Sequence, residues 1–149
     1  MWEPGSWADD WTLGLTMTVV TVIVHVLGLG IVGRFFDYMM TLFDHRLRRS
    51  LFRLVLIGAP TVALVFCLHA LESVLWAISY VSIGALPTFH QAVLYSLGAM
   101  STYGHAAVYL APDWQALGAI QALNGMIIFG LTVGFLSAIV RRVQNASVL

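Results

Sequence analysis

The chain has 149 residues, of which 60% are hydrophobic and 9% are charged, with a formal net charge of zero. A soluble domain carries about 25% charged residues, so this composition excludes an ordinary soluble protein and predicts an integral membrane protein. The length fits one small helical bundle rather than two domains.

The arginines indicate how the chain is oriented in the membrane. All seven basic residues are arginines, and they lie within residues 34–53 and 141–149. The N-terminal stretch carries Glu3, Asp9 and Asp10 and no basic residue. Because basic segments remain on the cytoplasmic side, we expect a multi-pass protein of the inner (plasma) membrane, with its N-terminus outside and its C-terminus in the cytoplasm.

Residues 1–53 are expected to form a short external arm, a first transmembrane helix and a cytoplasmic connector. The first span covers about Trp11–Gly33, which is uncharged and long enough to cross a bilayer. His25 inside this span has two interpretations, a neutral imidazole bonded to a neighbouring helix or a proton relay. Gly28 and Gly33 suit close helix packing. Residues 34–53 mix aromatic and charged side chains at helical spacing, which predicts an amphipathic helix at the cytoplasmic interface. We expect this helix to act as a connector and anchor, with a gating role as the alternative.

The second span is expected over residues 54–82 and carries polar side chains deep within it. His69, Glu72 and Trp76 follow one another at i, i+3 and i+7, so they share one helical face. A carboxylate at this depth needs a partner. Either Glu72 braces a neighbouring loop, supported by His69 and Trp76, or it is a titrating site on an ion path.

The sequence gives no sign of covalent or metal chemistry. Cys67 is the only cysteine, so no internal disulfide can form. The histidines are scattered along the sequence, and one His-x-x-Glu pair supplies too few ligands for a metal site. No nucleophile–base pair and no phosphate loop is visible. We therefore expect neither an enzyme nor a cofactor, and no metal beyond a permeant cation.

A short helix is expected over residues 88–101. Thr88 and Gln91 fit a capping box, which marks a helix start. A helix of about 13 residues reaches only halfway through a bilayer, and irregular backbone after it is tolerated only inside protein or beside water. The stretch therefore predicts a re-entrant pore helix and a loop. Entering from outside, this helix would direct its negative dipole end towards the membrane centre, which favours a cation there.

The third span is expected over residues 113–142 and is uncharged from Trp114 to Val140. Gly130 and Gly134 are spaced for close helix packing. Gly125 is either a packing position or a gating hinge.

From about His69 to Val140 the chain resembles the two-helix pore domain of potassium channels, particularly the small bacterial members. The similarity lies in HALESVLWA of the outer helix, GALPTFHQAVLYSLGAMST of the pore helix, the loop that follows, and APDWQALGAIQALNGMIIFGLTVGFLSAIV of the inner helix. It covers about half of the chain and leaves the first span and residues 34–53 outside.

The resemblance implies a tetramer in which residues 54–149 form the pore domain and residues 102–106 form the selectivity filter. Backbone carbonyls in such a filter replace the hydration shell of K⁺ or another monovalent cation. Gly125 aligns with the family's hinge glycine. The aligned filter, whose carbonyls up to residue 105 and whose threonine hydroxyl are the implied cation ligands, consists of Thr102, Tyr103, Gly104, His105 and Ala106.

Three residues depart from the family's filter pattern, namely His105, Ala106 and Ala107. An alanine at the left-handed position of the second glycine costs roughly 1–2 kcal/mol per chain. We therefore expect the inner sites, built by residues 102–104, to survive better than the outer ones, with altered selectivity. His105 either packs behind the filter, as the family's tyrosine does, or makes conduction sensitive to external pH, since histidine titrates near pH ~6.5.

Spacing along the third span predicts which residues line the pore. One stripe at i, i+3, i+7 and i+11 is expected to face the cavity, with Phe129 narrowing it. Gly130 and Gly134 would then face a neighbouring helix. The predicted pore-lining residues are Met126, Phe129, Val133 and Ser137.

Together these features predict an all-α integral membrane fold, with three transmembrane helices, a re-entrant pore helix and a filter loop in a tetrameric pore of the potassium-channel type. A homotetramer is expected because one chain is too short to enclose a pore. The predicted function is passive cation conduction, with the lipid bilayer and permeant cations as partners and no nucleic acid. Two alternatives remain open: a non-conducting, channel-like membrane protein acting as a sensor or assembly subunit, and a channel for another cation.

Overall fold

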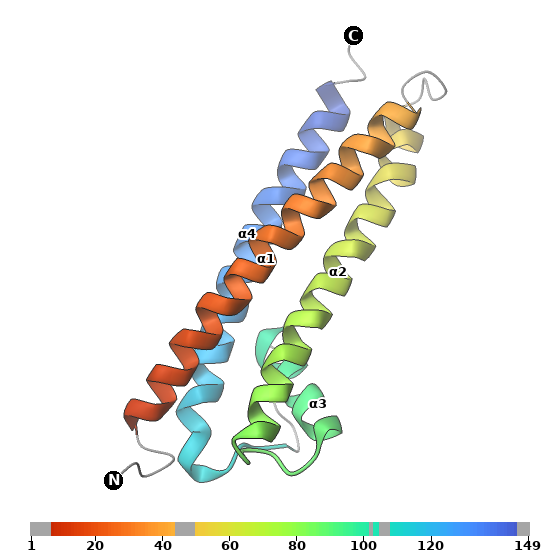
Figure 1. Ribbon diagram of the computed structural model, residues 1–149. Coiled ribbons are helices and arrows are strands. Elements are labelled where there is room, and N and C mark those ends of the chain that lie inside the picture. Colours follow the sequence, from red (N-terminus) through yellow and green to blue (C-terminus); the bar gives the residue numbers. More distant parts are fainter. Residues whose placement is uncertain (1–6, 44–49, 102, 105–107, 146–149) are drawn as a thin grey trace. The chain divides into compact units, whose positions relative to one another are not determined.

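The computed structural model describes residues 7–43, 50–101, 103–104 and 108–145. Within these residues the chain is helical, and Figure 1 shows the long helices α1, α2 and α4 and the short helix α3. The elements in chain order are α1 (Trp7–Phe43), α2 (Ser50–Ser82), α3 (Phe89–Met100), the 3₁₀ turn η1 (Pro112–Trp114) and α4 (Gln115–Asn145).

Three of these helices are long and apolar enough to cross a membrane, namely α1, α2 from Val55 onward, and η1 with α4. Several of their hydroxyl groups bond back to the backbone of their own helix, which satisfies them in apolar surroundings. Thr16, for example, donates from Oγ1 to the carbonyl of Thr12 at 2.7 Å. The prediction of three membrane-crossing helices is therefore confirmed at the level of length and composition.

The predicted boundary at Gly33 is wrong. Helix α1 runs on through residues 34–43, and α2 already begins at Ser50, so the predicted separate interfacial helix over residues 34–53 is not what the described residues form. The physical reason lies in the sequence, because no proline or glycine interrupts residues 34–43. Their apolar side chains continue one packed face, as buried Phe36 shows. Residues 44–49 lie outside the described part.

The chain forms two compact units, and each long helix contributes to both. Unit 1 comprises residues 1–24 and 70–128, and unit 2 comprises residues 25–69 and 129–149. The connection from α2 to α3 belongs to unit 1. It is set by Gly84, whose φ of +73° suits glycine at a helix C-terminus, and the following Ala85 N–H donates to the Tyr80 carbonyl at 2.9 Å.

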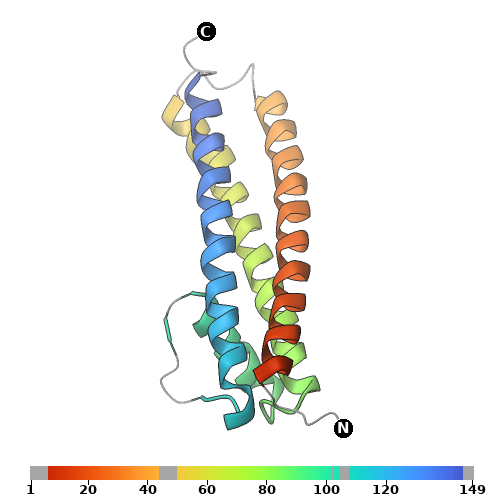
Figure 2. The same ribbon diagram turned by 90° about the vertical axis from the view of Figure 1, so that its left-hand side faces the viewer.

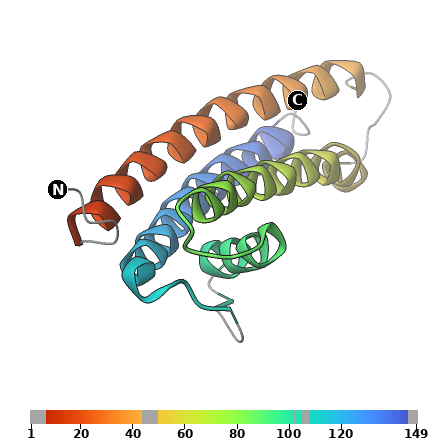
Figure 3. The same cartoon turned by 60° about the horizontal axis from the view of Figure 1, so that its bottom comes forward.

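Unit 1 packs α3 against the last turns of α2 and the first turns of α4. Figure 3 shows α3 beside this part of α2. Helix α1 is joined to α4 by Asn124, whose Nδ2 donates to the Thr21 hydroxyl at 2.9 Å. The buried core of unit 1 consists of Trp76, Ala77, Tyr80, Ala85, Leu86, Ala92, Tyr95, Ala99, Leu110, Trp114 and Leu117.

The described residues of unit 2 belong to parts of the three long helices, whose course can be followed in Figure 2. Its core holds Phe36, Ile57, Ile139 and Val143. Gly28 allows a close approach, since a β-carbon there would lie 2.6 Å from the Leu68 side chain, which confirms the packing predicted for Gly28. An exposed ion pair joins Arg142 to Asp37 at 2.8 Å; at this exposure we expect it to stabilise the unit by no more than about 1 kcal/mol.

Candidate functional site

Helix α3 begins where the sequence predicts. The Thr88 hydroxyl oxygen accepts the Gln91 N–H at 3.3 Å, with Thr88 in an extended conformation (φ −134°). The same hydroxyl donates to the Gln91 side-chain oxygen at 3.0 Å. This confirms the capping interaction predicted for the helix start, although here Gln91 reaches the hydroxyl group. With 12 residues, α3 is about 18 Å long, well short of a bilayer core of about 30 Å.

The backbone turns sharply after α3. The Ser101 N–H and hydroxyl both donate to the Leu97 carbonyl, at 3.0 and 2.6 Å. Further along, the Gly104 N–H donates to the Gly98 carbonyl at 3.2 Å. Gly104 has a φ of +82°, a conformation that favours glycine. These bonds fold the start of the predicted filter back onto the last turns of α3.

Of the predicted filter residues, the structure describes Tyr103 and Gly104. The Tyr103 side chain is 86% exposed, so the described residues leave it uncovered. Thr102, His105 and Ala106 lie outside the described residues, and their predicted roles as cation ligands stay predictions.

A buried hydrogen-bond chain holds α3 between α2 and α4. The Tyr80 hydroxyl donates to Gln121 Oε1 at 2.6 Å, and Gln121 Nε2 donates to the Ser96 hydroxyl at 2.6 Å. Ser96 in turn donates to the Ser73 carbonyl of α2 at 2.7 Å. Tyr80, Ser96 and Gln121 are all fully buried. Their polar groups are therefore satisfied by hydrogen bonds within the protein rather than by solvent.

Sequence reasoning missed this chain of bonds. The sequence feature that indicates such bonds is the presence of polar side chains inside apolar helices, above all Gln121 in the third span. Such a group costs free energy unless it is hydrogen-bonded, so Gln121 required a partner. Spacing within one helix, however, does not identify a partner on another helix.

The predicted support residues occupy different places. Trp76 is fully buried in the core of unit 1, with its ring centroid 6.0 Å from that of Tyr80, which lies 5.3 Å edge-to-face from Tyr95 of α3. Glu72 is also fully buried on α2. His69 Nε2 lies 2.9 Å from the Thr132 hydroxyl of α4, within unit 2. Trp76 therefore lies in the same core as α3, and the support roles of His69 and Glu72 stay predictions.

Two histidines that are far apart in the sequence meet in the structure. His25 of α1 and His69 of α2 lie with their ring centroids 5.2 Å apart. Residues 44 positions apart in the sequence meet here because the two helices pack side by side in unit 2, and periodicity within one helix carries no information on that pairing.

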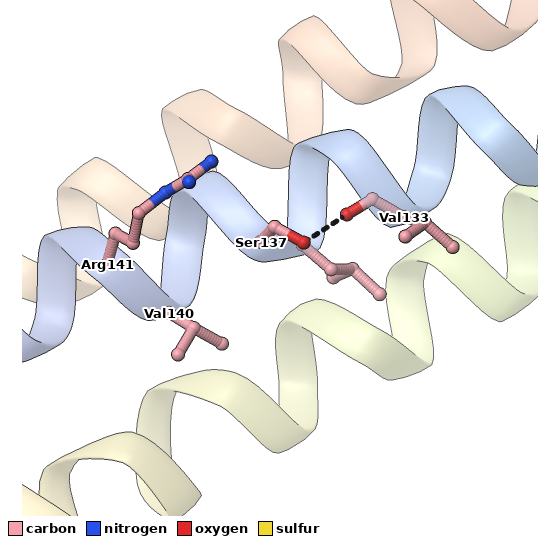
Figure 4. Close-up of a pocket in the computed structure, with 5 residues that line it drawn as sticks. Val133, Ser137, Val140 and Arg141 are labelled. Carbon is pink, nitrogen blue, oxygen red and sulfur yellow. Dashed lines mark hydrogen bonds between the residues drawn. The ribbon is translucent and has the colours of Figure 1, made fainter.

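The predicted pore-lining stripe is exposed in the single chain. Met126, Phe129 and Val133 are 61%, 63% and 48% exposed, and Ser137 is exposed as well. A shallow pocket on α4 includes part of this stripe (Figure 4), where the Ser137 hydroxyl bonds to the Val133 carbonyl at 2.7 Å. The residues that line the pocket are Val133, Leu136, Ser137, Val140 and Arg141.

Gly125 is a packing position. A β-carbon there would come within 2.7 Å of the Met100 Cα and carbonyl oxygen at the end of α3. Helix α4 runs through this position without a break. Of the two interpretations of Gly125, the close approach of two backbones is the one that its surroundings favour.

No protein-family model, no curated protein and no solved structure matches this chain.

Proposed function

We propose that this chain is the subunit of a homotetrameric channel that conducts monovalent cations passively. The observation that carries the proposal is α3 with the backbone that follows it. A capped helix of 12 residues ends in a non-helical segment with a positive φ at Gly104, between two helices long enough to span a membrane. In a bilayer such a half-length helix and irregular backbone are tolerated where they are buried in protein or line water.

The direction of α3 supports selection of cations. A helix carries about half a negative elementary charge at its C-terminal end, and residues 102–104 follow that end directly. Four such ends around one axis stabilise a positive ion without any acidic side chain. The carbonyls of the loop would then replace its hydration shell.

Two surfaces of α4 support assembly from several copies. Three apolar side chains of the predicted stripe, Met126, Phe129 and Val133, are exposed in the single chain, as expected of a helix that lines a cavity between subunits. Gly130 and Gly134 have no atom within 4 Å of an added β-carbon, so none of the helices that the structure describes packs closely against them. In the proposed tetramer the stripe faces the cavity and the glycines face a neighbouring subunit.

The outer half of the proposed filter differs in sequence from that of ordinary potassium channels. With Ala106 in place of a left-handed glycine, a tetramer would carry roughly 4–8 kcal/mol of strain, at roughly 1–2 kcal/mol per chain. We propose that the outer filter is wider for this reason, and that selectivity rests on residues 102–104. His105 at its mouth makes conduction sensitive to external pH.

A flux assay in liposomes tests the proposal with K⁺, Na⁺ and a large organic cation. We expect K⁺ or Na⁺ flux and exclusion of the organic cation. Gly104→Ala should lower the flux, because alanine at φ +82° is strained in each subunit and residue 104 belongs to the part of the filter on which selectivity is proposed to rest. Gly30→Ala is the matched control, since this exposed glycine has no atom within 4 Å of an added β-carbon.

Two outcomes would contradict the proposal. Absence of flux for every ion at several pH values would favour the non-conducting, channel-like protein. Flux of the organic cation at the rate of K⁺ would rule out a filter built by residues 102–104.

A further inference from the structure

Two imidazoles from different helices converge on one hydroxyl group inside unit 2. His25 Nε2 of α1 lies 3.1 Å from Thr132 Oγ1, and His69 Nε2 of α2 lies 2.9 Å from the same atom. His25 is fully buried, Thr132 is 5% exposed and His69 is half-buried. Both rings therefore present the same nitrogen towards one point.

The single proton of the Thr132 hydroxyl limits which of the two histidine Nε2 atoms can act as an acceptor. A threonine hydroxyl has one proton, whereas two N···O contacts need one proton each. At least one ring must therefore donate from Nε2, and the two neutral rings can hold different tautomers. Thr132 can bridge the pair by accepting from one imidazole and donating to the other, or by accepting from both.

The same arrangement suits a metal ion. The ligand nitrogens of His25 and His69 lie within 4.8 Å of each other, and two nitrogens on one tetrahedral Zn²⁺ lie about 3.3 Å apart. Ligation of one ion therefore requires the two rings to move closer together. Imidazole nitrogen suits Zn²⁺, Cu²⁺, Ni²⁺ and Co²⁺ rather than Mg²⁺ or Ca²⁺.

We propose that His25 and His69 form a binding site for one divalent transition-metal ion, which replaces the Thr132 hydroxyl between the two rings. A dication in apolar surroundings needs a balancing negative charge. Helix α2 carries Glu72 one turn beyond His69, so a carboxylate on the same face of the same helix can supply it. Binding would link α1 to α2 within unit 2.

Titration of the purified, chelator-treated full chain with Co²⁺ in detergent tests this proposal. We expect one Co²⁺ per chain, a visible absorption band typical of nitrogen ligation, and displacement by Zn²⁺. His25→Gln and His69→Gln should each weaken binding by at least tenfold, because loss of even an outer partner of a metal ligand costs about 10–100-fold. His90→Gln is the matched control, since His90 is exposed on α3.

A second measurement does not depend on the variants folding. Electron paramagnetic resonance of Cu²⁺ bound to the unaltered chain should show coupling to two imidazole nitrogens. Coupling to no more than one nitrogen, or equal Co²⁺ binding by wild type and both glutamine variants, would overturn the proposal. Because the readout is metal binding, failure here leaves the flux experiment unaffected, and absence of flux leaves the metal site unaffected.

Discussion

Gly125 of α4 and Met100 at the end of α3 approach so closely that a β-carbon on Gly125 would lie 2.7 Å from the Met100 backbone. Backbone cannot move aside as the end of a flexible side chain can. The absence of a side chain at residue 125 therefore fixes how near α4 lies to the helix that precedes the predicted filter.

We predict that Gly125→Ala destabilises the protein. Overpacking costs typically about 1–3 kcal/mol, which exceeds the gain of up to about 1 kcal/mol that alanine brings to a helix. Thermal unfolding in detergent should show a lower midpoint than wild type. Gly30→Ala, which meets no atom within 4 Å, should leave the midpoint unchanged or raise it. A Gly125→Ala variant as stable as wild type but with altered current would instead favour the hinge interpretation.

The buried bonds of Gln121 make a second prediction. Gln121→Leu leaves the Tyr80 hydroxyl and the Ser96 hydroxyl each without a partner that they have in the structure. The Ser96 hydroxyl still donates to the Ser73 carbonyl, whereas the Tyr80 hydroxyl loses its acceptor. An unsatisfied buried group costs about 1–3 kcal/mol, so the free energy of unfolding should fall by about that amount. Gln115→Leu, at an exposed position on the same helix, is the control.

The double variant Tyr80→Phe with Gln121→Leu separates this bond from general packing. Removing both partners is close to neutral for the bond between them, so the double variant should be more stable than the sum of the single effects. Strict additivity of the two single variants would mean that the 2.6 Å bond between Tyr80 and Gln121 contributes nothing.

The exposed glycines of α4 make a prediction on assembly. Gly130→Leu places a large side chain where the single chain has open space, so the fold of each subunit should persist. If the glycines pack against a neighbouring subunit, the variant should lose the tetramer, as native mass spectrometry would measure. Gly30→Leu in α1 is the control. Tetramers of Gly130→Leu that are as stable as those of wild type would place the contact elsewhere.

Conduction is expected to fall as external pH is lowered through about 6.5, the ordinary pKa of histidine. Protonation would put a positive charge at residue 105 of each subunit, which repels entering cations. His105→Tyr should remove this dependence while His90→Gln retains it, in currents recorded across a range of external pH. An identical pH profile in wild type and His105→Tyr would leave His105 as a packing residue.

Local signals predicted much of the fold. Apolar runs located three spans, and the spacing of Thr88 and Gln91 located the start of α3 to the residue. The end of α1 was mistaken because charged and aromatic residues were taken to mark an interfacial helix. Helix formation depends on the absence of breakers, and residues 34–43 contain none.

Contacts between helices were not predictable in the same way. The meeting of His25 with His69, and of Gln121 with Tyr80 and Ser96, depends on how helices pack rather than on the period within one helix. The sequence showed that each polar group needed a partner. It did not show which partner, since many pairings satisfy the same requirement.

A density map of the protein in a bilayer mimic containing K⁺ would show whether four chains form a filter around one axis. We predict four copies around one axis, with the carbonyls of residues 102–104 directed at that axis and ion density between them. A single copy, or four copies whose loops point away from a closed axis, would contradict it.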